Sequence, residues 1–277
     1  MAASETPVTT LVLASTGRSS DAGHLAAADL SSVAARLGVD YRLIGGTAVT
    51  LLVACHGVGD LVPPRETADA DFGAAGDVVA DPRLPAALTD LGYRRTSGNR
   101  FTRPHADAIG ELDVTIDVLA PSAVGRLRSN QPHGALLVDE VPGLALALRR
   151  PSTPVSLEVR LTSGVALIAA LDLPDVVSAL CLKAYAYAGR QQPRDALDIW
   201  RLLEAASAAG LRVADWPADE AATDAARILL SHFGRPMARG LVDATRSRPH
   251  QTRIRALVAR VVPGQADVAT RPAEPTE

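Results

Sequence analysis

Two aspartates separated by one residue, Asp69 and Asp71, form the pattern in this sequence that points most directly to chemistry. Residues 65–72 alternate with a period of two, as a strand does, which places both carboxylates on one face, about 7 Å apart at the backbone. Such carboxylates repel each other unless a cation lies between them, and oxygen-only ligands suit Mg²⁺. The alternative is a solvent-exposed polar strand face on which Arg65 pairs with Asp69.

A second alternating segment, residues 111–119, offers a third carboxylate. Asp113 and Asp117 fall on one face of this predicted strand. If the strand neighbours the first one, either of these residues would complete a site of three carboxylates. The alternation alone does not decide whether Asp113 or Asp117 is the third carboxylate.

A phosphate-binding turn is predicted between a short buried strand at 41–44 and a helix at 48–55. The turn has the residues Gly45, Gly46 and Thr47, so backbone N–H groups and a hydroxyl lie at a helix start, where a phosphate can bind. Gly-Gly also occurs in plain turns. The informative feature is the combination of this turn with a strand that carries two aspartates about 20 residues later.

The basic residues are unusually uneven, since Lys183 is the only lysine among 28 lysines and arginines. The bias toward alanine, valine and arginine is typical of high-GC coding, which turns lysine into arginine wherever either will serve. Lys183 is therefore a candidate for a position that needs a compact, flexible ammonium group. The alternative is that this one lysine codon persisted by chance.

Two motifs resemble the nucleotidyltransferases of the DNA polymerase β-like superfamily, and within it the AbiEii/MenT toxin-type branch. The first motif is Ile44-Gly45-Gly46-Thr47 followed by Asp69-Ala70-Asp71, with Thr47 where many members have serine. The second is Leu182-Lys183, Arg190, Arg194-Asp195 and Asp198, similar to a helical motif of that branch. The resemblance covers about residues 40–205.

This resemblance implies a nucleotidyltransferase in which Asp69 and Asp71 hold two Mg²⁺ ions and a third carboxylate holds the catalytic ion. Asp117 lies in mid-strand between apolar residues, as the superfamily's third carboxylate does, and we favour it over Asp113. The resemblance also implies that Lys183 contacts the triphosphate. The other nucleotide-binding candidates are Gly45, Gly46, Thr47, Arg65, Arg190, Arg194, Asp195 and Asp198.

The acceptor implied by the resemblance is RNA, with tRNA 3′ ends as the leading candidate, and the implied role is the toxin of a toxin–antitoxin pair with a cognate antitoxin. Residues 232–260 support RNA independently, because they contain seven arginines against Asp243 alone and arginines neutralise backbone phosphates. Fold does not fix substrate. A small-molecule or protein acceptor, or a non-catalytic nucleotide- or RNA-binding protein, therefore remains an alternative.

The elements that must position these residues indicate an α+β fold. We expect a flexible segment at 1–20, a small mixed-sheet nucleotidyltransferase domain at 21–168, an all-helical domain at 169–263 and a disordered tail at 264–277. The predicted strands are 41–44, 65–72, 111–119, 135–138, 144–149 and 155–161, with a hairpin at 93–103. The predicted helices are 21–37, 48–55, 82–91, 174–189, 194–207, 217–233, 236–245 and 249–261.

Composition excludes several other classes of protein. Hydrophobic residues make up 47% and charged residues 21% of the 277 residues, which argues against extensive disorder. No apolar run reaches the roughly 18 residues of a membrane span, and the start of the sequence lacks the pattern of a signal peptide. The two cysteines lie far apart, which argues against a disulfide framework or a structural zinc. We expect a cytoplasmic protein without a membrane partner.

Overall fold

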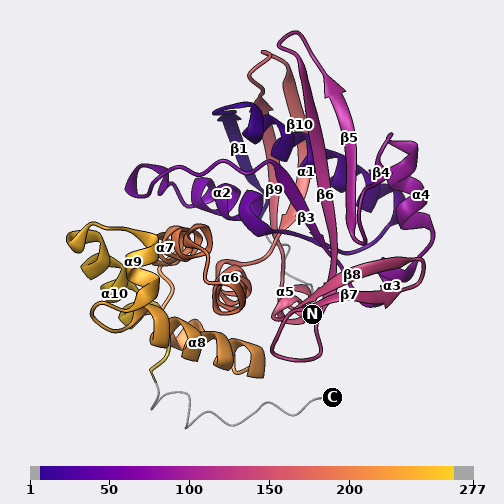
Figure 1. Cartoon of the computed structure of the whole chain (residues 1–277). Helices are drawn as coiled ribbons and strands as arrows, with labels where there is room; N and C mark the ends of the chain where they lie inside the picture. The colour runs from indigo at the N-terminus through magenta and orange to yellow at the C-terminus, as the bar shows by residue number, and fades with distance from the viewer. Residues whose placement is uncertain (1–6, 265–277) are drawn as a thin grey trace.

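The computed structural model describes residues 7–264 and contains two β-sheets and a set of helices (Figure 1). The larger, seven-stranded sheet has the order β2-β3-β6-β5-β4, and β8 pairs with both β6 and β7. Its strands are β2 (Arg42–Ile44), β3 (Asp69–Gly73), β4 (Arg94–Arg95), β5 (Arg100–Ala106), β6 (Glu111–Pro121), β7 (Arg128–His133) and β8 (Leu136–Val141).

Strand β6 is the centre of this sheet. It pairs in parallel with β3 on one side and antiparallel with β5 on the other, and its last residues pair in parallel with β8. Val114, Ile116 and Val118 are fully buried, so the alternate residues Thr115 and Asp117 lie on the opposite face. The alternation that predicted this strand therefore also decides which face carries the polar groups.

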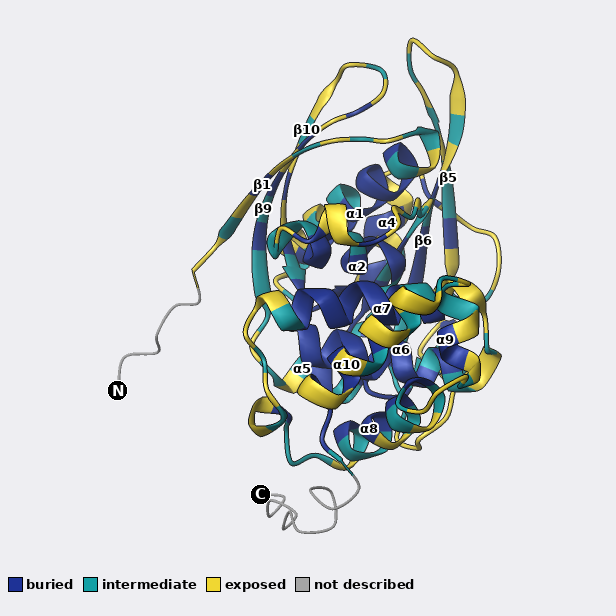
Figure 2. Cartoon of the chain, turned by 90° about the vertical axis from the view of Figure 1, so that its left-hand side faces the viewer, coloured by how far each residue is buried: buried dark blue, intermediate teal, exposed yellow. Residues whose placement is uncertain are grey.

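The smaller sheet has the order β1-β9-β10. Its strands are β1 (Thr9–Ala14), β9 (Thr153–Arg160) and β10 (Ala166–Leu173). Helix α1 (Arg18–Leu37) contacts β10 of this sheet and β3 and β6 of the larger one, so that it lies between the two sheets (Figure 2). Gly38 ends the helix in the left-handed conformation, which glycine adopts without steric cost.

Helix α2 (Gly45–Cys55) follows β2 directly and packs against β3. The short helices of this half of the chain are α3 (Gly76–Ala80), α4 (Arg83–Asp90) and α5 (Leu144–Arg149). Because α2 also contacts α7, it joins the sheet-containing half to the helices that follow.

Five helices follow β10 within the described residues. They are α6 (Val176–Arg190), α7 (Pro193–Ala208), α8 (Glu220–Phe233), α9 (Arg239–Ala244) and α10 (Arg248–Val261). Asp175 caps α6 by accepting hydrogen bonds from two backbone N–H groups, and Pro193 begins α7, where a missing N–H costs least. Buried apolar side chains of both halves form one continuous cluster. No described helix has the length and hydropathy needed to cross a bilayer.

These elements confirm an α+β architecture in which a mixed-sheet half precedes an all-helical half. The domain boundaries stay a prediction, and β10 runs across the boundary that we expected between residues 168 and 169. Residues 1–6 of the expected flexible segment and residues 265–277 of the expected tail lie outside the described part of the chain.

Two expectations were wrong because strand pairing overrides local preference. Residues 9–14, expected to be loosely ordered, form β1, since they pair in register with residues 155–160 of β9. Residues 166–173, where we expected the helical half to begin, form β10, which pairs antiparallel with β9. The partner of residues 9–14 is too far away in the sequence for a local pattern to reveal it. Strand β10, in contrast, follows β9 in a hairpin closed by residues 161–165, and its alternation was overlooked.

Three further segments differ from the expected strands. Residues 144–149 form α5 rather than a strand, because leucine, alanine and arginine all favour helix. Strand β3 begins at Asp69 and not at residue 65, since its pairing with β6 begins there. Residues 128–133 form β7, which we did not predict, because they contain few of the β-branched or aromatic residues that mark strands.

Candidate active site

The three carboxylates that we singled out meet on one face of the larger sheet. Asp71 of β3 lies directly beside Asp117 of β6 in the parallel pairing, and Asp69 lies beside Thr115. One oxygen from each of Asp69, Asp71 and Asp117 lies within 4.8 Å of the others. Asp113 is exposed, lies farther along β6 opposite Pro104 and does not join this group.

The electrostatics of this carboxylate cluster favour a bound cation. Burial, together with the negative charges of Asp69 and Asp117, raises the pKa of Asp71 to about 7. The ligand atoms are all hard carboxylate oxygens, which Mg²⁺ and other oxygen-seeking cations prefer. Asp69, Asp71 and Asp117 therefore fit a divalent cation in both charge and ligand type.

The turn between β2 and α2 brings the backbone against the cluster. Gly45 has a φ of 78°, and any side chain at this position would collide with the carboxylate of Asp71. A side chain at Gly46 would collide with the guanidinium of Arg65 and the hydroxyl of Thr67. Both glycines are thus required by close packing, and Gly45 borders the pocket in front of the cluster.

Thr47 points elsewhere in the structure. Its hydroxyl donates a 2.7 Å hydrogen bond to the backbone carbonyl of Asp69, so it connects α2 to the start of β3. The side chain borders a separate small cavity of about 20 Å³ beside His24. In this arrangement Thr47 positions the strand that carries Asp69 and Asp71, and contact with a phosphate would require the hydroxyl to give up its bond.

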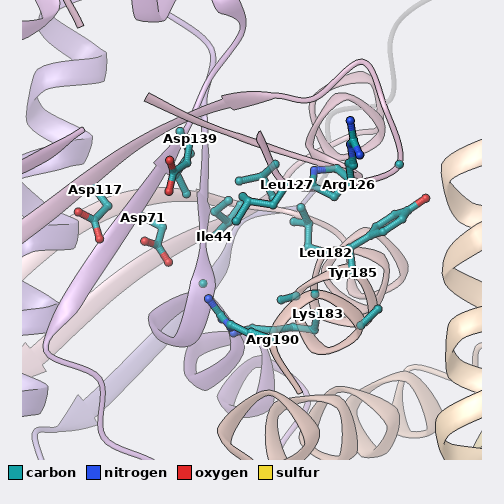
Figure 3. A pocket seen from close by; sticks show the side chains of 18 of the residues that line it. Ile44, Asp71, Asp117, Arg126, Leu127, Asp139, Leu182, Lys183, Tyr185 and Arg190 are labelled. Atoms are coloured by element: carbon teal, nitrogen blue, oxygen red, sulfur yellow. The ribbon is translucent and has the colours of Figure 1, made fainter. Parts of the chain in front are cut away.

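Lys183 and Arg190 of α6 face the cluster across the pocket (Figure 3). The ammonium of Lys183 is 2.7 Å from Asp198 and 3.6 Å from Asp195. Arg190 donates two hydrogen bonds to Asp195, of 2.6 and 2.7 Å. Burial alone would raise the pKa of Asp195, but the hydrogen bonds from Arg190 and the charge of Lys183 outweigh it and lower the pKa.

Asp198 of α7 is fully buried and is the centre of a second set of charges. One of its oxygens is 2.6 Å from Arg65, which precedes β3, and 2.7 Å from Lys183 of α6. The other lies 3.5 Å from Arg201, whose guanidinium also donates to Thr50 of α2. Arg65 therefore pairs with Asp198 and not with Asp69, and these contacts join α2, α6 and α7 to the strand that carries the carboxylates.

The pocket between the sheet and α6 has a volume of about 740 Å³. Asp71 and Asp117 lie on its sheet side, and Lys183 and Arg190 on its helical side (Figure 3). Apolar groups complete it, among them Ile44, Leu119, Leu127, Val141, Leu182 and Ile228. Of the residues that we predicted for the site, Gly46, Thr47, Arg65, Asp69, Arg194, Asp195 and Asp198 do not border the pocket. Arg194 is exposed on α7.

Sequence reasoning missed Arg100 and Asp139, which both border the pocket. Arg100 lies opposite Asp117 in the antiparallel pairing of β5 with β6 and donates to both of its carboxylate oxygens, over 2.9 and 2.7 Å. The sequence feature that could have identified Arg100 is the turn Asp107–Gly110. A hairpin closed at this turn places Arg100 opposite Asp117.

Comparisons with known proteins identify the family of this chain. A search of solved structures finds an antigenic nucleotidyltransferase-like protein from Paracoccidioides brasiliensis, 14% identical, with a TM-score of 0.46 over 91% of this chain and 98% of that one. None of the curated proteins matches the chain significantly. The family model for the AbiEii nucleotidyl transferase toxin of type IV toxin–antitoxin systems matches residues 29–272. The chain thus belongs to the AbiEii nucleotidyltransferase toxin family.

Proposed function

We propose that this nucleotidyltransferase moves a nucleotide from an NTP to a hydroxyl group of an RNA, in a reaction that depends on Mg²⁺, with tRNA 3′ ends as the leading acceptor. The observation that carries the proposal is the convergence of Asp69, Asp71 and Asp117 within 4.8 Å, opposite Lys183 and Arg190. A cluster of three carboxylates, two of which border the pocket opposite Lys183 and Arg190, suits a metal-bound triphosphate, which carries charge of both signs.

In the proposed reaction, the acceptor hydroxyl forms a bond to the α-phosphorus of the NTP while the bond from that phosphorus to pyrophosphate breaks. Magnesium bound to the carboxylates would activate the attacking oxygen and offset the negative charge on the leaving group. A carboxylate of the cluster accepts the proton of the hydroxyl. Lys183 and Arg190 attract the triphosphate from the helical side, and the absence of a side chain at Gly45 lets the backbone lie against Asp71 at the edge of the pocket.

The location of the basic segment 232–260 supports a large acceptor. Helices α9 and α10 of this segment pack on α7 and lie on the side of the helical half that faces away from the sheet (Figures 1 and 2). Arg235, Arg246, Arg248 and Arg260 are exposed there. A folded RNA is large enough to contact these arginines and still reach the pocket, whereas a small molecule is not.

Membership in a type IV toxin–antitoxin family implies a cognate antitoxin. We propose that such an antitoxin is a partner of this protein and that both act in the cytoplasm, where NTPs and tRNA are present. We propose no membrane partner for this protein.

The test is to incubate the purified chain with each α-labelled NTP, Mg²⁺ and total tRNA, beside the double variant Asp69→Ala/Asp71→Ala. We expect label to enter RNA with the wild type and not with the variant, because the variant lacks two of the three carboxylates. Gel electrophoresis of the RNA shows which labelled NTP was used and thus identifies the transferred nucleotide.

Three outcomes contradict parts of the proposal. Label that enters a small molecule or a protein, but no RNA, would replace the acceptor and keep nucleotidyl transfer. A failure to transfer any nucleotide, together with calorimetry that detects no binding of ATP and Mg²⁺, would overturn the proposed reaction itself. Binding without transfer would favour a non-catalytic nucleotide- or RNA-binding role.

A further inference from the structure

Arg100 and Asp117 form an ion pair inside the proposed metal site. The guanidinium Nε donates to Oδ1 of Asp117 over 2.9 Å, and Nη2 donates to Oδ2 over 2.7 Å, so that both carboxylate oxygens are engaged. The antiparallel register of β5 and β6 sets this pairing. A divalent cation that takes an oxygen of Asp117 as a ligand therefore competes directly with Arg100.

Among the charged residues that border the pocket, Arg100 differs from Lys183 and Arg190 in the partner that it binds. Lys183 and Arg190 pair with Asp198 and Asp195, which are fully buried and lie outside the carboxylate cluster. These pairs can persist when a divalent cation binds. Arg100 pairs with a member of the cluster itself, and so it alone of the three would lose its partner.

The surroundings of Arg100 also allow it to move. Its side chain is 49% exposed, whereas that of Asp117 is 12% exposed, so the guanidinium lies at the open side of the pair. Because the guanidinium keeps contact with water, releasing it costs less than breaking a fully buried ion pair. The side chain borders the pocket together with Asn99, which keeps a released guanidinium within reach of a bound molecule.

We propose that Arg100 is a positioning residue: it holds the carboxylate of Asp117 in place until a divalent cation takes over, and then turns to a phosphate of the nucleotide in the pocket. This inference rests on the proposed nucleotidyl transfer. The planar guanidinium fork matches a phosphate as well as a carboxylate. The exchange couples metal binding to nucleotide binding, since the ion that completes the site also frees a cation for the triphosphate.

The first test measures Mn²⁺ binding to the full chain by calorimetry without any nucleotide. Arg100→Ala and Arg100→Gln should bind Mn²⁺ more tightly than the wild type, by on the order of tenfold, because the competing cation is gone. Arg100→Lys keeps a charge without the fork and should fall between. The matched control is Arg83→Ala, since Arg83 also binds a carboxylate, that of Asp81, with two nitrogens, away from the pocket. This control should not change the affinity.

The second test adds non-hydrolysable α,β-methylene analogues of the four NTPs in saturating Mn²⁺. Arg100→Ala and Arg100→Gln should bind the analogue weaker by about fivefold, although they bind the metal better. A structural role of Arg100 would not produce these opposite changes. Mn²⁺ affinity that is unchanged or weaker in both variants overturns the inference, as does unchanged affinity for all four analogues.

The two proposals can fail separately. If both affinities change as expected but the wild type labels no RNA, the role of Arg100 stands and the proposed acceptor is wrong. If the wild type labels RNA while Mn²⁺ affinity does not respond to Arg100, the proposed function stands and this inference is wrong. Because two different neutral side chains are compared, misfolding of one variant leaves the other to decide.

Discussion

The two sides of the pocket differ in how many cations pair with their aspartates. On the sheet side, Asp69, Asp71 and Asp117 lie together, and the ion pairs of the described residues include one cation at this cluster, Arg100. On the helical side two buried aspartates, Asp195 and Asp198, have four cations around them. These cations are Lys183, Arg190, Arg65 and Arg201.

We infer from this difference that the sheet-side carboxylates are available to a ligand, whereas the charged groups on the helical side stabilise the fold. Carboxylates that lack cations destabilise the fold, and they persist where a ligand supplies the missing charge. Aspartates surrounded by cations need no ligand, and their contacts fix the position of Lys183 and Arg190. Substitutions on the two sides should therefore change stability in opposite directions.

The largest effect is expected on the helical side, at Asp198. Asp198→Ala leaves Arg65, Lys183 and Arg201 without the carboxylate that they share. Removing one partner of a buried ion pair costs about 3–5 kcal/mol, and we expect the free energy of unfolding to fall by that amount. Urea denaturation followed by circular dichroism measures it.

Asp198→Asn is the control for this experiment, because it keeps the shape and one hydrogen-bond acceptor while it removes the charge. It should also destabilise the protein, by less than the alanine variant. A loss below about 1 kcal/mol in both variants would place Asp198 among ordinary surface pairs and would contradict the comparison between the two sides.

A smaller effect of the opposite sign is expected on the sheet side, at Asp71. Since the folded protein raises the pKa of Asp71 to about 7, it binds this proton more tightly than the unfolded chain does. The free energy of unfolding should therefore fall as the pH rises from about 4 to 7. Asp71→Asn removes this dependence, and at pH 7.5 with EDTA it should be more stable than the wild type by about 2 kcal/mol.

The measurement compares urea denaturation of the wild type and Asp71→Asn at pH 5 and pH 7.5. The difference between the two proteins should be larger at pH 7.5. Mg²⁺ should stabilise the wild type more than the variant, and the variant should not transfer nucleotides. A variant less stable than the wild type at pH 7.5 would mean that Asp71 has a structural role and would remove the contrast with Asp198.

The sequence predicted the binding side of this comparison better than the structural side. The alternation of 65–72 and 111–119 was enough to place Asp69, Asp71 and Asp117 on strand faces, because a period of two fixes which side chains share a face. The family model confirms the resemblance to the AbiEii nucleotidyltransferases, and the observed elements confirm the α+β fold class. Whether Asp117 or Asp113 joins the cluster depended on the register of β3 with β6, which the alternation does not determine.

What sequence reasoning missed depends on pairings between distant segments. Arg100 reaches Asp117 only because the hairpin turns at 107–110, and β1 exists only because β9 lies beside it. The phosphate contact of Thr47 stays a prediction, and the sequence did not reveal that its hydroxyl donates a hydrogen bond to the backbone carbonyl of Asp69. Residue type and spacing do not indicate which of several partners a hydroxyl or guanidinium will find.

The smallest effect concerns Arg190 and Arg194, two arginines of one predicted motif that the structure places differently. Arg190 borders the pocket and binds Asp195, whereas Arg194 is exposed outside it. Arg190→Gln should weaken binding of an α,β-methylene NTP analogue by about tenfold, and Arg194→Gln by less than about twofold, because a charge in contact with water is screened. Calorimetry in saturating Mn²⁺ measures both affinities, and melting temperatures show whether the loss of the contact with Asp195 destabilises the fold. Equal losses in the two variants would mean that the helical side attracts the triphosphate by its overall charge rather than by the cations at the pocket.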